Sequence, residues 1–150
     1  MILLFKYRGF EVLGEYLADF IWQSRGEEED LWQGVDAIIP VPLHWKRQKK
    51  RGFNQAQVMA KRLGRLKGVR VVEKRLIRVK NVPPQTSLQG AERAGNVRGA
   101  FRVRKGEDLR GKIVLLVDDV YTTGSTLFEC SRVLKEAGVK DVRAVTVAQA

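Results

Sequence analysis

Hydrophobic residues recur at helical spacing in three parts of the chain. Between residues 12 and 21 they fall three or four positions apart, and the same spacing returns over 53–66 and 127–137. This spacing places apolar side chains on one face, so it predicts three amphipathic helices. Asn54 is placed to cap the start of the second helix, and Gly68 lies near its end.

Short apolar runs lie at 36–41, 113–117 and 142–147. Runs of this length and composition predict strands, and the continuous run over 113–117 is typical of a sheet covered on both faces. The last two strands flank the helix over 127–137 with short connections, which predicts a crossover between parallel strands. We therefore expect an α/β fold, with a central, mostly parallel sheet and flanking helices in a single domain over residues 1–150.

Three other stretches lack clear periodicity. Residues 26–34 are predicted to form an acidic loop or frayed turn, and residues 43–52 a basic loop. Residues 81–99 hold two prolines and three glycines among many polar side chains. Because loops of this length inside a compact domain usually serve function, we expect this segment to be mobile and to order over a bound ligand.

The composition indicates a folded domain rather than a disordered chain, since 44% of the 150 residues are apolar and 30% are charged. No apolar run approaches membrane-spanning length, and Lys6 and Arg8 interrupt the beginning, where a secretory signal would be apolar. Cys130 is the single cysteine, so an internal disulfide or a cysteine zinc site is excluded, and its place on a helical apolar stripe predicts a core residue. We expect a cytoplasmic protein with no membrane span.

Positive charge is the first feature that points to a ligand. Twenty-eight Lys and Arg against 17 Asp and Glu give a net charge of +11 and a pI near 10.2, which favours nucleic acid, nucleotides or an acidic membrane surface. One basic run covers residues 46–51. A second run follows helical spacing, and three of its members are candidate nucleic-acid ligands: Lys61, Arg62 and Arg65. The alternative for this second run is a solvated helix face with ion pairs.

The most informative stretch for function runs from Val114 to Thr126. Apolar strand residues lead into two adjacent carboxylates, Asp118 and Asp119, at the strand's carboxyl end, where open α/β sheets bind ligands. The following residues open a helix and offer hydroxyl and backbone N–H groups to a phosphate: Tyr121, Thr122, Thr123, Gly124, Ser125 and Thr126. Carboxylates accept hydrogen bonds from sugar hydroxyls and hold Mg²⁺ through water. The stretch therefore predicts a site for a sugar phosphate with its metal.

Two other phosphate-binding motifs are absent from the chain. It contains neither Gly-x-x-x-x-Gly-Lys-Ser/Thr nor Gly-x-Gly-x-x-Gly. A strand-to-helix turn capped for purely structural reasons accounts for one aspartate and one threonine, but not for two aspartates with several hydroxyls around Gly124. A ligand site is the better interpretation.

This stretch resembles the motif with which type I phosphoribosyltransferases bind 5-phosphoribosyl-1-pyrophosphate (PRPP). Further blocks in matching order resemble the ComF-type (ComF/GntX) competence proteins: Pro40–His44, Arg51–Gln55, Pro84–Gln85, Arg93, Asn96 and Gly99–Phe101. The resemblance covers residues 5–150. It implies the type I phosphoribosyltransferase fold with a small hood in residues 1–35, PRPP as substrate, Mg²⁺ as cofactor and competence proteins as partners.

The resemblance also implies roles for individual residues. Asp118 and Asp119 would be catalytic, facing the ribose hydroxyls and holding Mg²⁺ indirectly, while residues 122–126 would bind the 5-phosphate. Residues 43–52 would form the pyrophosphate loop, and Arg93 would lie on the loop that closes over the site. The candidate groups around the leaving pyrophosphate are Arg47, Lys50, Arg51, Gly52 and Arg93. Because adjacent strand residues point to opposite faces, we expect one aspartate to be a direct ligand and the other to act through water or Mg²⁺.

Two functions fit these residues. The first is transfer of phosphoribose to an unidentified acceptor with release of pyrophosphate. The second is a DNA-uptake factor that binds single-stranded DNA on the same scaffold with little or no turnover, for which Trp45 offers a stacking ring. The single histidine, His44, is expected to be incidental rather than catalytic. Many ComF-type proteins carry an N-terminal four-cysteine zinc module that this chain lacks, so the sequence is expected to be either a short member of the family or a trimmed one.

Overall fold

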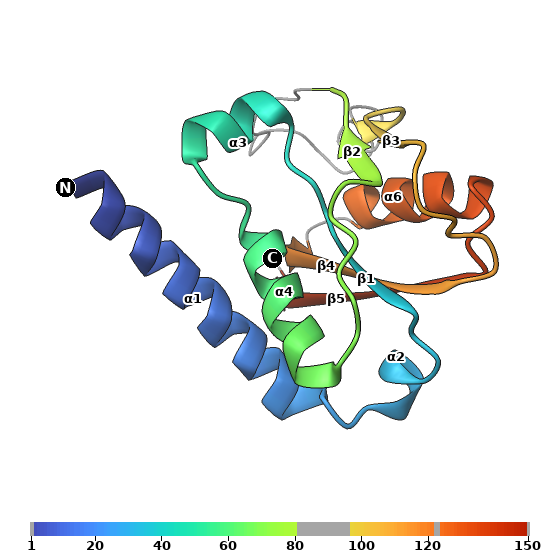
Figure 1. The fold of residues 1–150 in the computed structure, drawn as a ribbon, viewed down its shortest axis with the longest axis horizontal. Coiled ribbons are helices and arrows are strands. Elements are labelled where there is room, and N and C mark those ends of the chain that lie inside the picture. Colours follow the sequence, from blue (N-terminus) through green and yellow to red (C-terminus); the bar gives the residue numbers. More distant parts are fainter. Residues whose placement is uncertain (1, 81–96, 122–123, 150) are drawn as a thin grey trace.

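The computed structural model describes residues 2–80, 97–121 and 124–149. Figure 1 labels the helices and strands along the chain. They are α1 (Ile2–Arg25), α2 (Glu29–Trp32), β1 (Ala37–Pro40), α3 (Trp45–Arg51), α4 (Gln55–Lys67), β2 (Leu76–Arg78), β3 (Phe101–Val103), β4 (Ile113–Tyr121), α6 (Ser125–Glu136) and β5 (Asp141–Gln149).

The central sheet has the order β1-β4-β5, and both neighbouring pairs run parallel. Ala37 pairs with Val114 and Ile113 with Asp141, and the connection from β4 to β5 passes through α6. An isolated parallel bridge joins Ile38 to Val71, so the chain after α4 continues the sheet beyond β1. The α/β class and the parallel crossover predicted from the apolar runs are confirmed.

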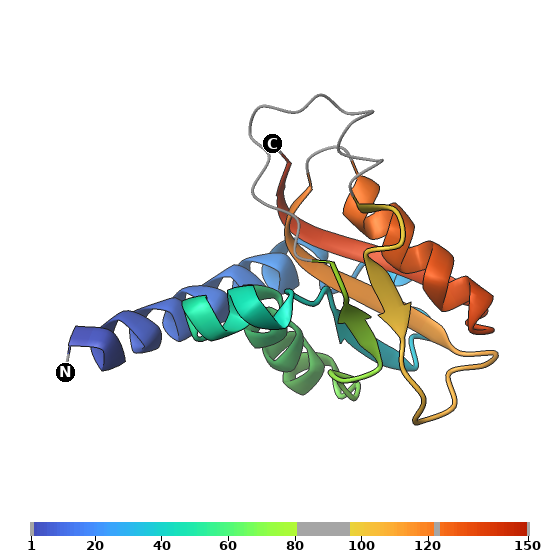
Figure 2. The same cartoon turned by 90° about the horizontal axis from the view of Figure 1, so that it is seen from above.

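Helices cover both faces of this sheet, as Figure 2 shows with α6 on one side and α1 and α4 on the other. Successive side chains of β4 alternate between the faces. Val114 and Leu116 join the core under α6, whereas Leu115 and Val117 join the core under α4. All four side chains are fully buried, which explains why this strand reads as a continuous apolar run.

Helix α1 forms where the spacing predicted it, but most of its apolar stripe faces away from the core. Tyr16 and Phe20 are 69% and 59% exposed, while Ala18 and Ile21 are buried. The face that packs against α4 comes closest at Gly14, where an added Cβ would lie 2.6 Å from a side-chain carbon of Val58. Close helix approach there, together with burial of Ile21, therefore determines which face of α1 is covered.

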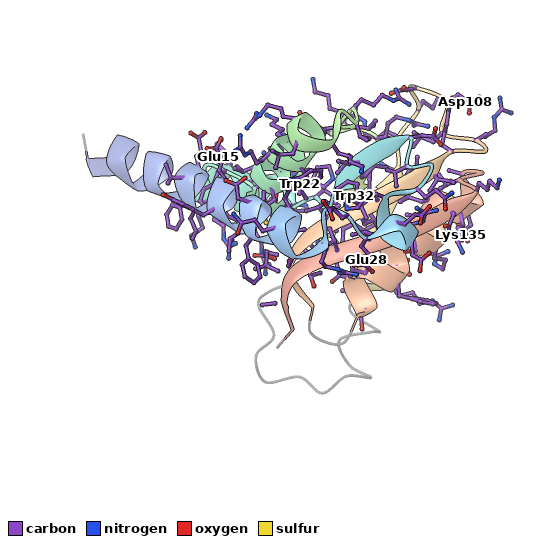
Figure 3. The ribbon with its side chains drawn as sticks, turned by 90° about the horizontal axis from the view of Figure 1, so that it is seen from below. Glu15, Trp22, Glu28, Trp32, Asp108 and Lys135 are labelled. Atoms are coloured by element: carbon purple, nitrogen blue, oxygen red, sulfur yellow. The ribbon has the colours of Figure 1, made fainter. Side chains whose placement is uncertain are left out.

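The N-terminal region expected to act as a hood consists of α1 and α2. Within it, the prediction of a loop over 26–34 is wrong in part, because Glu29–Trp32 is a helical turn. Trp32 is buried, its indole N–H donates to the carbonyl of Arg25 at 2.9 Å, and its ring meets Trp22 edge-on at 5.9 Å. Figure 3 shows both tryptophans where α1 ends beside α2. Burial of a large aromatic ring orders a stretch whose charged composition suggested a loop.

A two-stranded antiparallel sheet stands beside the central sheet. It pairs β2 with β3, with Leu76 opposite Val103 and Arg78 opposite Phe101. Residues 81–96 between these strands lie outside the described residues, so the loop predicted over 81–99 is described only at its end. Across the described ranges, no helix has the length and hydrophobicity needed to cross a membrane.

Candidate active site

A cavity of about 170 Å³ opens at the carboxyl ends of β1 and β4. Its lining combines two carboxylates, two guanidinium groups and the start of two helices. The lining residues are Val41, Pro42, Leu43, Arg51, Asn54, Gln55, Ala56, Arg78, Asp118, Asp119 and Thr126. The sheet edge that the sequence predicted for ligand binding is therefore hollowed and carries charges of both signs.

Asp118 and Asp119 both border this cavity, but they do not lie beyond the end of the strand. β4 stops pairing with β1 at Val117 and continues to pair with β5 as far as Tyr121. The strand predicted over 113–117 thus continues through the acidic pair, because β5 extends further than β1. The pair lies where one side of the strand has lost its neighbour, which exposes the carboxylates to the cavity.

The pKa of Asp118 is raised to about 8, first by burial and then by hydrogen bonding to and repulsion from the adjacent Asp119 carboxylate. The backbone N–H of Asp119 donates to Asp118 Oδ1 at 2.9 Å, which opposes this rise without cancelling it. Two adjacent carboxyl groups therefore lie in a poorly solvated place, where ionising both of them is unfavourable. A divalent cation or a set of sugar hydroxyls would relieve that repulsion.

The start of α6 supplies the predicted phosphate-binding end of the site. Gly124 caps the helix with φ +79°, a left-handed conformation that side chains rarely adopt, and the amide of Phe128 donates to its carbonyl at 2.8 Å. Ser125 and Thr126 form the first turn, and Thr126 lines the cavity. An anion placed here would meet the backbone N–H groups of the helix start. Thr122 and Thr123 lie outside the described residues.

The basic segment predicted as a loop over 43–52 is instead the helix α3. His44 caps it, because its Nδ1 accepts a hydrogen bond from the Lys46 amide at 3.2 Å, and Gly52 ends it in a left-handed conformation. Lysine, arginine and glutamine are good helix formers, so two capping residues suffice to fold the run. The role of His44 at this position is structural.

Helix α3 brings some of the predicted cations to the site. Arg51 lines the cavity, and the charge of Arg47 lowers the pKa of Arg78, which places Arg47 near the same wall. Lys50 is exposed on α3, and Gly52 follows the helix. Arg93, the remaining predicted catalytic cation, lies outside the described residues.

Arg78 is the charged lining residue that the sequence interpretation missed. On a strand, residues two positions apart share a face, and Leu76 on β2 is buried. Arg78 lies on that same inward face, and its guanidinium stacks over Phe101 at 5.2 Å from the ring centroid. The signal available in the sequence was an arginine two positions after the apolar Leu76, a spacing that places both side chains on one face of a strand.

The candidate nucleic-acid residues of α4 do not lie at the cavity. Each forms an ion pair with an acidic side chain: Lys61 with Glu73 at 3.3 Å, Arg62 with Asp19 at 2.8 Å and Arg65 with Glu15 at 3.2 Å. Two of these partners belong to α1, on which Figure 3 labels Glu15. The pairing favours the alternative interpretation of this run, a solvated helix face held by ion pairs.

The comparisons with known proteins agree with this arrangement. Residues 16–150 match the phosphoribosyl transferase domain family. The chain belongs to this family. Among solved structures, it resembles a purine phosphoribosyltransferase from Pyrococcus horikoshii with a TM-score of 0.58 and 20% identity, over 89% of this chain and 74% of that one. At this identity the likeness shows the fold.

Curated relatives confirm the ComF-type resemblance of the sequence blocks. The chain is 38% identical over 116 residues to competence protein F of Haemophilus influenzae, which covers 77% of this chain and 51% of that protein. It is 34% identical over 108 residues to the DNA utilization protein YhgH of Escherichia coli O6:H1, over 72% of this chain and 47% of that protein. The chain thus spans about half the length of the curated relatives it matches.

Proposed function

We propose that this phosphoribosyltransferase-family domain binds PRPP with Mg²⁺ and transfers its phosphoribosyl group to an acceptor, releasing pyrophosphate. The observation that carries the proposal is the charge arrangement around one cavity. The acidic pair Asp118 and Asp119 faces the same space as Thr126 from the start of α6 and the guanidinium of Arg51. This set of groups suits a ribose that carries a phosphate and a pyrophosphate.

Each group has a task in such a transfer. Asp118 and Asp119 accept hydrogen bonds from the ribose hydroxyls, while the N–H groups and hydroxyl of the α6 start hold the 5-phosphate. The cations of α3 stabilise the negative charge that grows on pyrophosphate as the bond to the anomeric carbon breaks. Since the barrier lies in separating these charges, catalysis rests on their placement more than on a nucleophile supplied by the protein.

The acidic pair also fits Mg²⁺. Magnesium typically keeps several waters and is held by one or two carboxylates together with substrate phosphates. In the described part of the chain, no three His, Cys, Asp or Glu side chains gather into a metal cage, so the metal would depend on Asp118, Asp119, water and the substrate. When bound there, it would supply positive charge to the substrate oxygens.

Thermal unfolding tests the proposal. PRPP with Mg²⁺ should raise the melting temperature of the native protein, by an amount equivalent to about 2.7 kcal/mol when PRPP is present at 100 times its dissociation constant. Asp118→Asn combined with Asp119→Asn should remove this shift while the protein still folds. Asp108→Asn is the matched control, because Asp108 lies exposed beside Arg110, before β4 begins. An unchanged shift in the double variant would contradict the assignment.

Turnover is tested separately by pyrophosphate release from PRPP in the presence of nucleobases and amines. Release that requires one acceptor class identifies the second substrate. PRPP binding without release by any acceptor would leave a PRPP-binding protein and contradict the transferase part of the proposal.

A second candidate function is binding of single-stranded DNA, which one observation favours. The α3 cations Lys49, Lys50 and Arg51 have no ion-pair partner within the described residues, and Trp45 beside them is 62% exposed. Exposed cations with an aromatic ring suit a phosphate backbone with stacked bases. A relative bears the name DNA utilization protein. Binding carried by these residues should show little sequence preference and weaken steeply with salt.

A further inference from the structure

Arg78 places a charged group at the cavity wall. Its side chain is only partly exposed, and within the described residues its Nε has no hydrogen-bond partner and no carboxylate lies within ion-pair distance of it. A desolvated guanidinium with an unused donor is costly in a folded protein. Such a group is stabilised when an anion binds beside it.

The position of Arg78 is fixed from two directions. On the backbone it ends β2, where it pairs in register with Phe101 of β3. On the side chain, the guanidinium stacks over the buried ring of Phe101. A stacked guanidinium keeps its N–H groups at the ring edge available for ligands while losing little rotational freedom on binding. Arg78 is therefore preorganised.

The surrounding charges indicate what kind of ligand Arg78 meets. Burial lowers its pKa, and the nearby positive charge of Arg47 lowers it further, whereas the charge of Asp118 acts in the opposite direction. Arg51 lines the same cavity. Two arginines, Arg51 and Arg78, thus face a space whose carboxylates, among the described lining residues, come from β4 alone. Like charges held together in this way favour a ligand with several negative charges.

We propose that Arg78 binds the pyrophosphate group of PRPP from β2, opposite the cations of α3. This inference rests on the proposed function and adds a second wall to the pyrophosphate site. The planar fork of arginine matches two phosphate oxygens, and its charge counters the charge that builds up on the leaving group. Arg78 then acts on the departing pyrophosphate, and Asp118 and Asp119 act on the ribose.

Calorimetric titration with three probes tests this assignment: PRPP with Mg²⁺, inorganic pyrophosphate with Mg²⁺, and ribose 5-phosphate. Arg78→Gln should weaken PRPP and pyrophosphate binding by about 10- to 100-fold, which is the usual range for one charged hydrogen-bonding group, and should leave ribose 5-phosphate binding unchanged. Arg102→Gln is the matched control, because Arg102 lies on the same two-stranded sheet but is exposed. It should bind all three probes like the native protein.

Two further variants separate charge, shape and folding. Arg78→Lys keeps the charge and the fold but loses the bidentate fork, so pyrophosphate binding should recover only in part relative to Arg78→Gln. Phe101→Leu keeps the arginine and removes the ring beneath it, so pyrophosphate binding should fall by about threefold to tenfold. Melting temperatures measured without ligand identify any variant that binds poorly because it is unfolded.

These measurements distinguish failure of the Arg78 assignment from failure of the proposed function. If Arg78→Gln and Arg78→Lys bind PRPP and pyrophosphate like the native protein, only the role of Arg78 is overturned. A loss confined to ribose 5-phosphate would assign Arg78 to the 5-phosphate and also overturn it. If the native protein binds pyrophosphate through Arg78 but does not bind PRPP, the proposed function fails while Arg78 remains an anion ligand. If the native protein binds neither anion, both proposals fail.

Discussion

Helices α3 and α4 follow one another in the chain and are both basic, yet their cations have different surroundings. On α4, Lys61, Arg62 and Arg65 each face a carboxylate within 3.3 Å. On α3, Lys49 and Lys50 are exposed and have no such partner among the described residues. Both helices are basic, but among the described residues these three cations of α4 are paired with acids, whereas Lys49 and Lys50 of α3 are not.

The difference follows from what each helix packs against. α4 buries Met59 and Leu63 against the sheet and lies along α1, which supplies Asp19 and Glu15. α3 buries none of its side chains and is held mainly by its two ends. A net charge of +11 therefore says little about a binding surface until the neighbouring acids are known.

The largest expected effect reverses the cations of α3. Changing Lys49, Lys50 and Arg51 to Glu should weaken binding of single-stranded DNA by about 100-fold or more at low salt, because several phosphate contacts are replaced by repulsion. Fluorescence anisotropy with an end-labelled oligonucleotide at two salt concentrations measures this loss. The slope of affinity against salt should decrease as well.

The α4 variant Lys61→Gln, Arg62→Gln and Arg65→Gln is the matched control, since it removes three cations from a neighbouring helix. It should retain DNA affinity to within about threefold, because those cations are already paired with acids of the fold. Stronger loss in the α4 variant than in the α3 variant would reverse the comparison. Absence of DNA binding by the native protein at low salt would exclude DNA as a ligand. The cations of α3 would then remain candidates for pyrophosphate binding alone.

A second comparison concerns two acidic side chains, Asp118 and Asp108. The expected effect of Asp118 on stability is of intermediate size. Its folded-state pKa of about 8 lies above the ordinary value of 3.8, so the folded protein holds a proton that the unfolded chain releases. Stability from this group is complete below about pH 4 and is lost as the pH rises toward 8. Asp118→Asn removes that loss.

Differential scanning fluorimetry in chelator-containing buffer measures this effect. Asp118→Asn should melt about 3 to 6 °C above the native protein at pH 8.5 and should match it near pH 4. Asp108→Asn is a contrasting control, because Arg110 holds the pKa of Asp108 down to about 2 and its loss should not stabilise the protein at high pH. Equal melting temperatures of native and Asp118→Asn protein at pH 8.5 would show that the fold does not raise the pKa of Asp118.

Local sequence patterns predicted the elements whose structure depends on residues close together in the chain. Asn54 caps α4 as expected, with its Oδ1 accepting from the Ala56 amide at 3.0 Å, and the alternating burial of β4 follows from its continuous apolar run. The acidic pair and the candidate phosphate-binding helix start were visible because one short stretch contains them. Each of these features depends on residues close together in the chain.

What the sequence did not predict depends on distant residues. Asp19 and Arg62 are 43 positions apart, and no spacing rule pairs them. The helical state of α3 required His44 to act as a cap, a role that its residue type rarely takes. Arg78 reaches the cavity only because β2 pairs with β3 and stacks the guanidinium on Phe101. Pairing across the fold, rather than local preference, made these contacts.

The smallest expected effect tests whether the α4 charges really belong to the fold. Arg62 donates from Nε to Asp19 Oδ1 at 2.8 Å, and both side chains are about one-third exposed. Water screens such a pair, so its coupling free energy should be only about 0.2–1 kcal/mol. A double-mutant cycle with Arg62→Gln, Asp19→Asn and the combined variant measures this value by urea unfolding. DNA affinity of the same variants should stay unchanged. Zero coupling together with weaker DNA binding in Arg62→Gln would mean that Arg62 serves a ligand after all, and the distinction between the two helices would be wrong.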